Sequence, residues 1–582
     1  MTSTYVPQGT TTRLTPADEA ASSASSSENM KQQAFHEWPN EAGFDGLTEH
    51  RGPIELKVKG NIPSWAAGSL YRTGPGQCKV QDTKSGTFHI SHWFDGLAHT
   101  HRFDIVSDGT TVRVYYSSRR QSDKVAADIK SAGTLRSMSF GQKLDPCVGL
   151  FGKFMSVFNK RPSLINVGVT VGVNVPSFKT PAKAAVDAQG HRATNIVIGT
   201  DAAVMCEMDP TTLEPISFPK HSRFHPDLKG PLGGAHGKFD PDTGDYINYN
   251  LELKKQPVYR VFRVSAATGK TDILAAIPYK AAFVHSFFMT RNYVVLCVPV
   301  AHYEWNGLRI PWEGNMHDSF KPFDPSETCR WFVVDRRHGK GVVAEFASPA
   351  RFFFHTVNAF EDDDNDGDLF CEVIDYPNRY IIDAYYYDVI LNRNNKAAAF
   401  WTDGQLAQKS FPRLTRYRLR KKDFFAVTGK YTTPAPVESV MEIPAPHAGD
   451  MPVINPQYRC RKHRYGYHLV SRALSTLFDA IVKVDTETRE LLQWEGPPGH
   501  TPGEAIFIPR RGEGEEGEEG EEGEEAQVLD EDDGVLLSVV LDGANRTSYL
   551  LCLDARTMTE LGSAECEFAV AIGLHGRHVP AS

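Results

Sequence analysis

Four histidines stand in apolar or glycine-rich surroundings at widely separated points of the chain. Burying an imidazole among phenylalanine and valine side chains is costly unless both ring nitrogens find partners. A single residue of this kind is most simply a hydrogen-bonded histidine of the core. Four of them indicate imidazoles that converge on one metal ion, and they are His236, His285, His355 and His575.

The other potential ligands narrow the kind of metal. The nine cysteines include no pair at the spacing of a zinc site, and no His-Glu-x-x-His segment is present. An all-imidazole site suits a borderline transition metal such as iron. Because neutral ligands leave the charge of a divalent ion uncompensated, we expect carboxylates that orient the imidazoles. The candidates, each equally compatible with an ordinary turn or strand-end residue, are Glu207, Asp450 and Glu504.

Most of the chain has the pattern of short strands separated by turns rich in Gly, Pro, Asn and Asp. Aspartate-threonine turns recur between strands, for example at residues 209–212, 240–243 and 485–488. Many short antiparallel strands with recurring turns predict an all-β protein, and in particular a β-propeller. The repeat is too degenerate for the number of blades to be counted.

Two segments differ in composition from this strand-rich body. Residues 1–35 are rich in Ser, Thr and Ala and lack periodicity, so we expect a disordered N-terminal tail. Residues 36–582 are then expected to form one catalytic domain. Within it, the Gly-Glu tract at residues 512–525 is flanked by strands and is best interpreted as a solvated loop insertion.

Residues 145–158 combine apolar side chains at helical spacing with nearby lysines. One interpretation is a helix packed on the core. The other is an amphipathic segment that dips into a membrane interface while its lysines stay at headgroup level. The side chains that would enter the membrane are Leu150, Phe151, Phe154 and Phe158.

Composition excludes several classes of protein. With 582 residues, 41% of them hydrophobic, the chain can bury a large core. An odd number of cysteines without CxxC pairs argues against a disulfide framework and for a reducing compartment. No apolar run reaches 18 residues, so we expect neither secretion nor a membrane span.

The net charge is −9, but residues 513–533 alone carry thirteen acidic side chains and no basic one. The mildly basic remainder tolerates an anionic membrane surface, and we expect no nucleic-acid partner.

Six short segments carry a more specific signal. They are residues 71–76 (YRTGPG), 93–96 (WFDG), 283–287 (FVHSF), 354–362 (FHTVNAFED), 532–540 (DDGVLLSVV) and 574–576 (LHG). With these segments the chain resembles the carotenoid cleavage oxygenases over residues 45–580, and in particular their fungal torulene- and carotenoid-cleaving members.

The resemblance implies a seven-bladed β-propeller with a cap of helices and loops over an axial metal site. One Fe(2+) per chain would be held by His236, His285, His355 and His575. The carboxylates behind these ligands would be Glu207, with Asp201 as the rival for its place, Asp450, which is one methylene shorter than the usual glutamate, and Glu504. Residues 145–158 match the membrane-facing patch of the family. The implied protein is cytoplasmic and monotopic, bound peripherally to a membrane.

The reaction implied is oxidative cleavage of a C=C double bond in a carotenoid, with both atoms of O2 ending as carbonyl oxygens. No acid or base beyond the metal site is required. Resveratrol-cleaving relatives typically place a lysine before the first orienting carboxylate, where this chain has Cys206 if that carboxylate is Glu207. A carotenoid substrate is therefore favoured, with torulene first. A stilbenoid, β-carotene or an apocarotenoid are the alternatives.

Two other functional classes are open at this point. A propeller scaffold without catalytic activity would use the histidines as core residues and bind no metal. A calcium-binding module is suggested by residues 362–367, which match the start of an EF-hand loop. The twelfth position of that loop is Val373, and no helices are expected on either side. We interpret this segment as a hairpin turn.

Overall fold

The structure is a computed structural model that describes residues 5–143, 165–178, 193–403, 410–424, 434–510 and 530–581. Two predicted segments lie outside the described residues. They are the membrane-facing segment 145–158, with Leu150, Phe151, Phe154 and Phe158, and the Gly-Glu insertion 512–525. No helix within the described ranges is long and apolar enough to cross a membrane.

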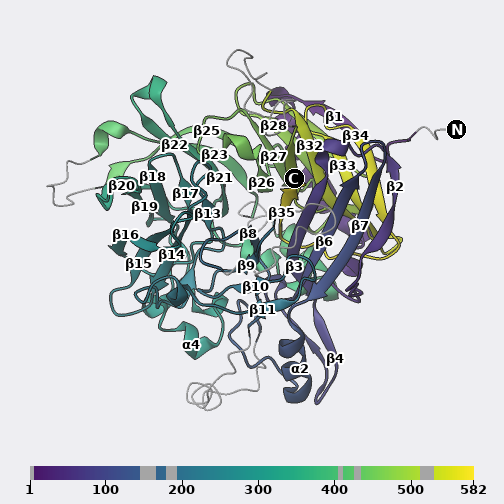
Figure 1. The fold of residues 1–582 in the computed structure, drawn as a ribbon, viewed down its shortest axis with the longest axis horizontal. Coiled ribbons are helices and arrows are strands. Elements are labelled where there is room, and N and C mark those ends of the chain that lie inside the picture. Colours follow the sequence, from purple (N-terminus) through teal and green to yellow (C-terminus); the bar gives the residue numbers. More distant parts are fainter. Residues whose placement is uncertain are drawn as a thin grey trace.

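In the described part of the chain, mostly antiparallel sheets surround a central axis (Figure 1), and they form seven blades when the continuous ten-stranded sheet is divided at β2. The first blade contains β35 (His575–Pro580), β3 (Gly68–Gln77), β6 (Leu97–Ser107) and β7 (Val112–Arg120). The second contains β8 (Thr170–Val173), β9 (Ile196–Gly199), β10 (Cys206–Met208) and β11 (Pro215–Ser217). The third contains β12 (Leu232–Gly233), β13 (Lys238–Phe239), β14 (Tyr246–Glu252), β15 (Val258–Val264) and β16 (Thr271–Pro278).

The next two blades continue around the ring in chain order. The fourth contains β17 (Phe288–Met289), β18 (Tyr293–Val298), β19 (Thr328–Asp335) and β20 (Val342–Pro349), with β24 (Ala435–Pro436) parallel to β20. The fifth contains β21 (Phe352–Asp362), β22 (Asp368–Tyr376), β23 (Arg413–Leu419) and β25 (Glu438–Pro444). Residues 362–367 form the turn between β21 and β22, which confirms the interpretation as a hairpin.

The last two blades close the ring. The sixth contains β26 (Asp450–Val453), β27 (Tyr465–Val470), β28 (Ala480–Asp485) and β29 (Leu491–Glu495). The seventh contains β30 (His500–Pro502), β31 (Ile506–Pro509), β32 (Gly534–Asp542), β33 (Thr547–Asp554) and β34 (Glu560–Cys566). The strand β2 (Ile54–Gly60) pairs with both β34 and β7, and the C-terminal β35 pairs with β3. Strands from both ends of the chain therefore join the first and seventh blades, and the predicted propeller is confirmed.

The strand β18 shows why the blades have long apolar sequences. Its side chains alternate between two separate cores, with Val294 and Leu296 in one and Val295 and Cys297 in the other. Successive residues of a strand point to opposite faces, so a blade packed between two neighbours is buried on both. Each such side chain contributes about 1.5–3 kcal/mol on burial.

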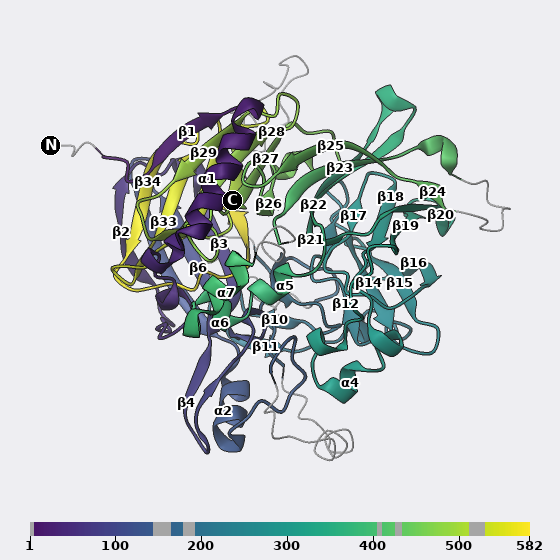
Figure 2. The ribbon, with the colours of Figure 1, turned by 180° about the vertical axis from the view of Figure 1, so that it is seen from behind.

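The N-terminal segment is part of this fold, and the prediction of a disordered tail is wrong for residues 5–35. The strand β1 (Thr10–Leu14) adds to the sixth blade by pairing with β29. The helix α1 (Glu19–Lys31) then crosses the face of the propeller turned toward the reader in Figure 2. Met30 and Phe35 are buried there. Low hydrophobicity predicted disorder, but an edge strand is held by backbone hydrogen bonds, which any sequence can supply.

Short helices gather on the same face, near the axis in Figure 2. They are α5 (Ile381–Ala384), α6 (Tyr387–Ile390) and α7 (Lys396–Thr402), with α2 (Asp123–Ala132) and α4 (Ile310–Glu313) further out. The hairpin of β4 (Lys79–Thr83) and β5 (Gly86–His89) extends beside α2. These elements form the predicted cap of helices and loops.

Candidate metal centre

The inner strands of four blades bring the four predicted histidines to the propeller axis. His236 lies between β12 and β13, His285 comes just before β17, His355 lies within β21, and His575 begins β35. Close packing at the axis requires glycine. A Cβ atom on Gly74 would lie 2.5 Å from the backbone of Gly573 and of Leu574. Glycine at this position lets β3 approach the segment that ends in His575.

The four imidazoles converge on one point. One ligand nitrogen of each histidine lies within 4.8 Å of those of the other three. The Nε2 atoms of His236 and His285 are 3.1 Å apart, and those of His355 and His575 are 3.0 Å apart. Nε2 atoms that face one another across so small a space are arranged to share a metal ion.

Three of the imidazoles have a carboxylate behind them. His285 Nδ1 lies 2.8 Å from Asp201 Oδ1, His355 Nδ1 lies 2.6 Å from Asp450 Oδ1, and His575 Nδ1 lies 2.8 Å from Glu504 Oε1. A ring that donates its Nδ1–H to a carboxylate keeps the Nε2 lone pair directed at the axis. Among the described residues, no carboxylate contacts His236.

The structure corrects one predicted carboxylate and places the other two at the site. Glu207 lies on β10, where its carboxylate accepts a hydrogen bond of 2.6 Å from the Ser217 hydroxyl. Asp201, in the turn that follows β9, takes the place expected for Glu207. Asp450 reaches His355 despite its shorter side chain, and its other oxygen accepts a hydrogen bond from the Tyr376 hydroxyl at 2.7 Å.

The electrostatics of the site keep His236 and His355 in the neutral form that binds metal. Burial lowers the pKa of His236 far below its usual value, and the neighbouring histidines lower it further. Burial also lowers the pKa of His355, against the opposing effect of Asp450. Neutral imidazoles with carboxylates behind them are the donor set that a divalent transition metal needs. The residues present therefore fit a metal ion.

One side of the histidine cluster is aromatic. The ring of Phe354 lies 5.7 Å from that of His285, and Phe283 lies 5.9 Å from the same imidazole. Phe94 packs on Phe354 at 5.7 Å and on Phe140 at 5.0 Å. These rings give the metal site an apolar flank.

The neighbouring motif WFDG positions part of this flank. It forms a turn, Trp93–Asp95, whose Asp95 accepts hydrogen bonds from the backbone N–H groups of Phe140 and Gly141. Burial raises the pKa of Asp95 to about 6, against the lowering effect of those N–H groups. The motif therefore fixes the loop that carries Phe140 to the aromatic cluster.

Another side of the cluster faces a cavity of about 450 Å³. His236, His355, His575 and Glu504 line one part of it. The remainder includes three basic residues, Lys238, Arg459 and Arg577, that the sequence interpretation missed.

The strand period is the signal that could have found one of these basic residues. Arg577 follows His575 by two residues on β35. Since alternate residues of a strand share a face, the Arg577 side chain lies on the same face as that of His575. The three cations are close enough to affect one another. Arg459 lowers the pKa of Arg577 to about 9, with burial adding to the effect, and burial followed by Arg459 lowers the pKa of Lys238 to about 8.

Comparisons with known proteins agree with this geometry. The family model described as retinal pigment epithelial membrane protein matches residues 43–580. A carotenoid dioxygenase of Neurospora crassa is 49% identical, over 99% of this chain and 96% of its own length. A torulene dioxygenase of Fusarium fujikuroi is 47% identical, over 95% of this chain and 96% of its own. A solved apocarotenoid oxygenase of Synechocystis superposes with a TM-score of 0.67 at 20% identity, covering 94% of this chain and 98% of that one.

Proposed function

This chain belongs to the retinal pigment epithelial membrane protein family of carotenoid oxygenases, and on that premise we propose that it is an iron-dependent dioxygenase that cleaves a C=C bond of torulene. Cleavage of a carotenoid double bond is the activity of the family. The observation that carries the proposal is the convergence of four imidazoles beside an aromatic flank.

Iron is the metal that we propose for the site, at one ion per chain. Bound iron would supply the activation of O2. The Nε2 atoms of the four histidines would bind the iron. The carboxylates of Asp201, Asp450 and Glu504 fix the orientation of three of the rings. Burial of His285 and His355 excludes water from the apolar side. No other described side chain is needed as an acid or a base.

Torulene is the proposed substrate for two reasons. One is the 47% identity to the torulene dioxygenase of Fusarium fujikuroi. The other is that no cation able to bind a phenol directly precedes either Asp201 or Glu207 in the sequence. Thr200 precedes Asp201, and Cys206 is fully buried on β10. The aromatic flank formed by Phe94, Phe283 and Phe354 suits a hydrocarbon polyene.

Product analysis tests the proposal directly. The iron-loaded protein is incubated in separate reactions with torulene, β-carotene, an apocarotenal and resveratrol under isotopically labelled O2. We expect torulene to give two carbonyl fragments, each carrying one labelled oxygen. Cleavage of resveratrol alone would show that the substrate is a stilbenoid and not a carotenoid. The absence of any cleavage by fully loaded protein would favour a propeller scaffold.

The substrate is proposed to arrive from a membrane surface in the cytoplasm. Carotenoids partition into bilayers, and residues 145–158 have the apolar spacing and lysines of an interfacial segment. The support for this proposal is the sequence pattern alone. Peripheral binding of this kind would let the polyene pass from lipid to the protein without crossing water.

A further inference from the structure

The cavity beside the histidines has a basic lining drawn from three blades. Lys238 lies on β13, Arg577 lies on β35, and Arg459 follows the turn Pro456–Tyr458. The lining also includes the exposed Pro580, so the cavity extends from the metal centre to the protein surface. None of the aromatic residues Phe94, Phe140, Phe283 or Phe354 lines it.

These three cations have no described carboxylate partner. Lys238 Nζ donates a hydrogen bond of 3.1 Å to Thr356 Oγ1, and the Arg577 guanidinium lies 5.9 Å from the centre of the Phe239 ring. Neither contact neutralises charge. A cation enclosed in a fold without an anion is unfavourable, because desolvation is not offset by an ion pair.

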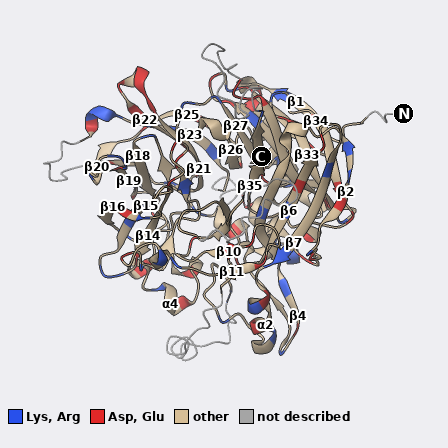
Figure 3. Ribbon diagram, in the orientation of Figure 1, with Lys and Arg blue, Asp and Glu red and all other residues tan. Residues whose placement is uncertain are grey.

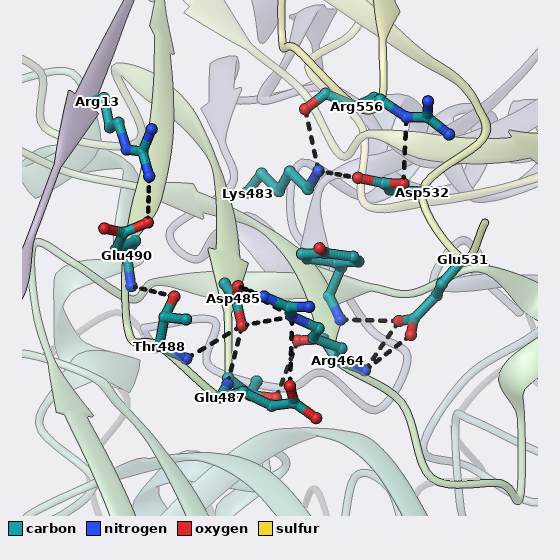
Figure 4. Close-up of polar contacts among 12 residues, drawn as sticks. Arg13, Arg464, Lys483, Asp485, Glu487, Thr488, Glu490, Glu531, Asp532 and Arg556 are labelled. Atoms are coloured by element: carbon teal, nitrogen blue, oxygen red, sulfur yellow. Dashed lines mark hydrogen bonds and ion pairs between the residues drawn. The ribbon is translucent and has the colours of Figure 1, made fainter.

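Other buried basic residues are compensated either by backbone carbonyls, as Arg72 is by those of Glu504 and Ile572, or by carboxylates, as Figure 4 shows for residues of the sixth and seventh blades. Lys483 Nζ lies 2.6 Å from Asp532 Oδ2, and Arg464 makes a close ion pair with Asp485. The side chain of Lys483 is 7% exposed, so this is a buried cation with its counter-ion in place. Over the blades as a whole, Figure 3 shows acidic residues interspersed with basic ones. The axial cavity departs from this pattern.

The carboxylates closest to the cavity are already engaged. Glu504 accepts from His575 Nδ1 through one oxygen and from the Gly576 N–H through the other, both at 2.8 Å. Asp450 is hydrogen-bonded to His355 and to Tyr376. A divalent ion held by neutral imidazoles would add further positive charge at the same wall. The three carboxylates behind the imidazoles balance the charge of that ion, so among the described residues Lys238, Arg459 and Arg577 keep no anionic partner.

We propose that this cavity is a binding site for a small oxyanion, a carboxylate or a phosphate, held by Lys238, Arg459 and Arg577 on the polar side of the metal centre. A guanidinium presents two parallel N–H donors that match the oxygens of either group. A volume of about 450 Å³ accepts a phosphate with several waters, since each water occupies about 30 Å³ in the liquid.

Calorimetric titration of the full chain tests the site, with inorganic phosphate and acetate in separate arms at constant ionic strength in chloride. Both the iron-loaded and the metal-free protein are titrated, and the melting temperature is measured at each anion concentration. We expect saturable binding in at least one arm, tighter for the iron-loaded protein. A ligand of the folded state should raise the melting temperature by roughly 1–3 °C when it saturates the site. The arm that binds identifies the oxyanion class.

Arg459→Met is the decisive variant, and Arg461→Gln is its matched control. Arg461 lies two residues away, with a side chain 62% exposed and facing Asp242. Losing a charged donor should weaken anion binding by about tenfold or more in Arg459→Met. The same variant should melt at a higher temperature than the wild type without anion, because it removes mutual repulsion among the cations. Lys238→Met serves as a second variant should Arg459→Met fail to fold.

Unchanged binding in both Arg459→Met and Lys238→Met, or no saturable binding of either anion to the wild type, would overturn the proposal. Equal loss of binding in Arg461→Gln would overturn it too, because the effect would then be one of general surface charge. These outcomes are independent of catalysis. Cleavage of torulene by a protein that binds no anion would leave the proposed function intact and remove only this site.

Discussion

The two flanks of the histidine cluster differ in charge, although a single strand supplies residues to both. On β21, Phe354 packs among the aromatic rings, His355 faces the other imidazoles, and Thr356 accepts the hydrogen bond of Lys238. Three consecutive residues thus pass from the apolar flank, through the metal centre, to the cationic cavity. The register of β21 is irregular between Phe353 and Thr356, and a β-bulge of this kind re-aims side chains that a regular strand would place on one face.

The contrast shows what each flank can admit. The rings of Phe94, Phe140, Phe283 and Phe354 offer dispersion contacts and no hydrogen-bond donors, which suits a polyene. The cavity with Lys238 and Arg459 offers charged donors beside apolar side chains such as Phe288 and Phe507. The metal centre lies between the two.

Removing a histidine of the metal centre between the two flanks should have the largest effect. We expect His285→Ala to lose the metal, from about one iron per chain to background, because three neutral donors replace four. Metal analysis by mass spectrometry measures this, and circular dichroism checks that the fold persists. His338→Ala, which removes an exposed histidine, is the control. Full iron occupancy in His285→Ala would mean that the ligand assignment is wrong.

The carboxylates behind the rings should give graded losses. Asp450→Asn and Glu504→Gln should each lower metal affinity or turnover by about 10–100-fold, because an amide orients the imidazole less strongly. Glu207→Gln is the matched control, since Glu207 contacts Ser217 and not a histidine. Iron titration and turnover are measured for all three. A loss in Glu207→Gln as large as that in Glu504→Gln would contradict the corrected assignment.

A change confined to the aromatic flank should separate catalysis from metal binding. Phe94→Leu should keep its iron and lower kcat/KM for torulene by about tenfold, because misplacing the double bond lowers the population of reactive geometry. Phe568→Leu makes the same substitution in a different core, next to Tyr116, and should leave kcat/KM unchanged. Loss of iron in Phe94→Leu would show that the two flanks are not independent.

The approach to the aromatic flank should depend on the membrane segment. Substituting Phe151 and Phe154 by Ser removes two side chains, each worth roughly 1.5–3 kcal/mol when buried. We expect co-sedimentation with liposomes to be abolished and turnover of membrane-loaded carotenoid to fall. Turnover of detergent-solubilised substrate should survive. If both activities fall and the cooperative melting transition is lost, the segment is part of the core.

The smallest effect is expected from deleting residues 512–525. A glycine-glutamate sequence offers neither apolar area nor metal ligands in an apolar setting, so turnover should stay within about twofold of the wild type. The acidic residues that follow the tract are bound to the blades, as Asp532 is to Lys483, and they stay in the variant. A large loss of turnover on either substrate preparation would assign the tract a role at the site.

Local patterns in the sequence were sufficient to predict the propeller architecture and the convergence of the four histidines. Short strands with recurring turns predicted a propeller, and imidazoles in apolar surroundings predicted a common metal site. Both follow from neighbouring residues, because strand periodicity and the cost of burying a polar ring act over a few positions. Arg577 could have been found in the same way, since it follows His575 by two positions on one strand.

Only the tertiary structure decided which groups meet across blades. Asp201 and His285 are 84 residues apart, and their hydrogen bond forms where the turn after β9 and the segment before β17 meet near the axis, which no local pattern encodes. The prediction of disorder that composition gave for residues 5–35 was wrong for a similar reason. The strand β1 is held by backbone pairing with β29, which is more than 470 residues away in the sequence. Long-range contacts of this kind form only when the ring closes, and small displacements decide which carboxylate reaches which imidazole.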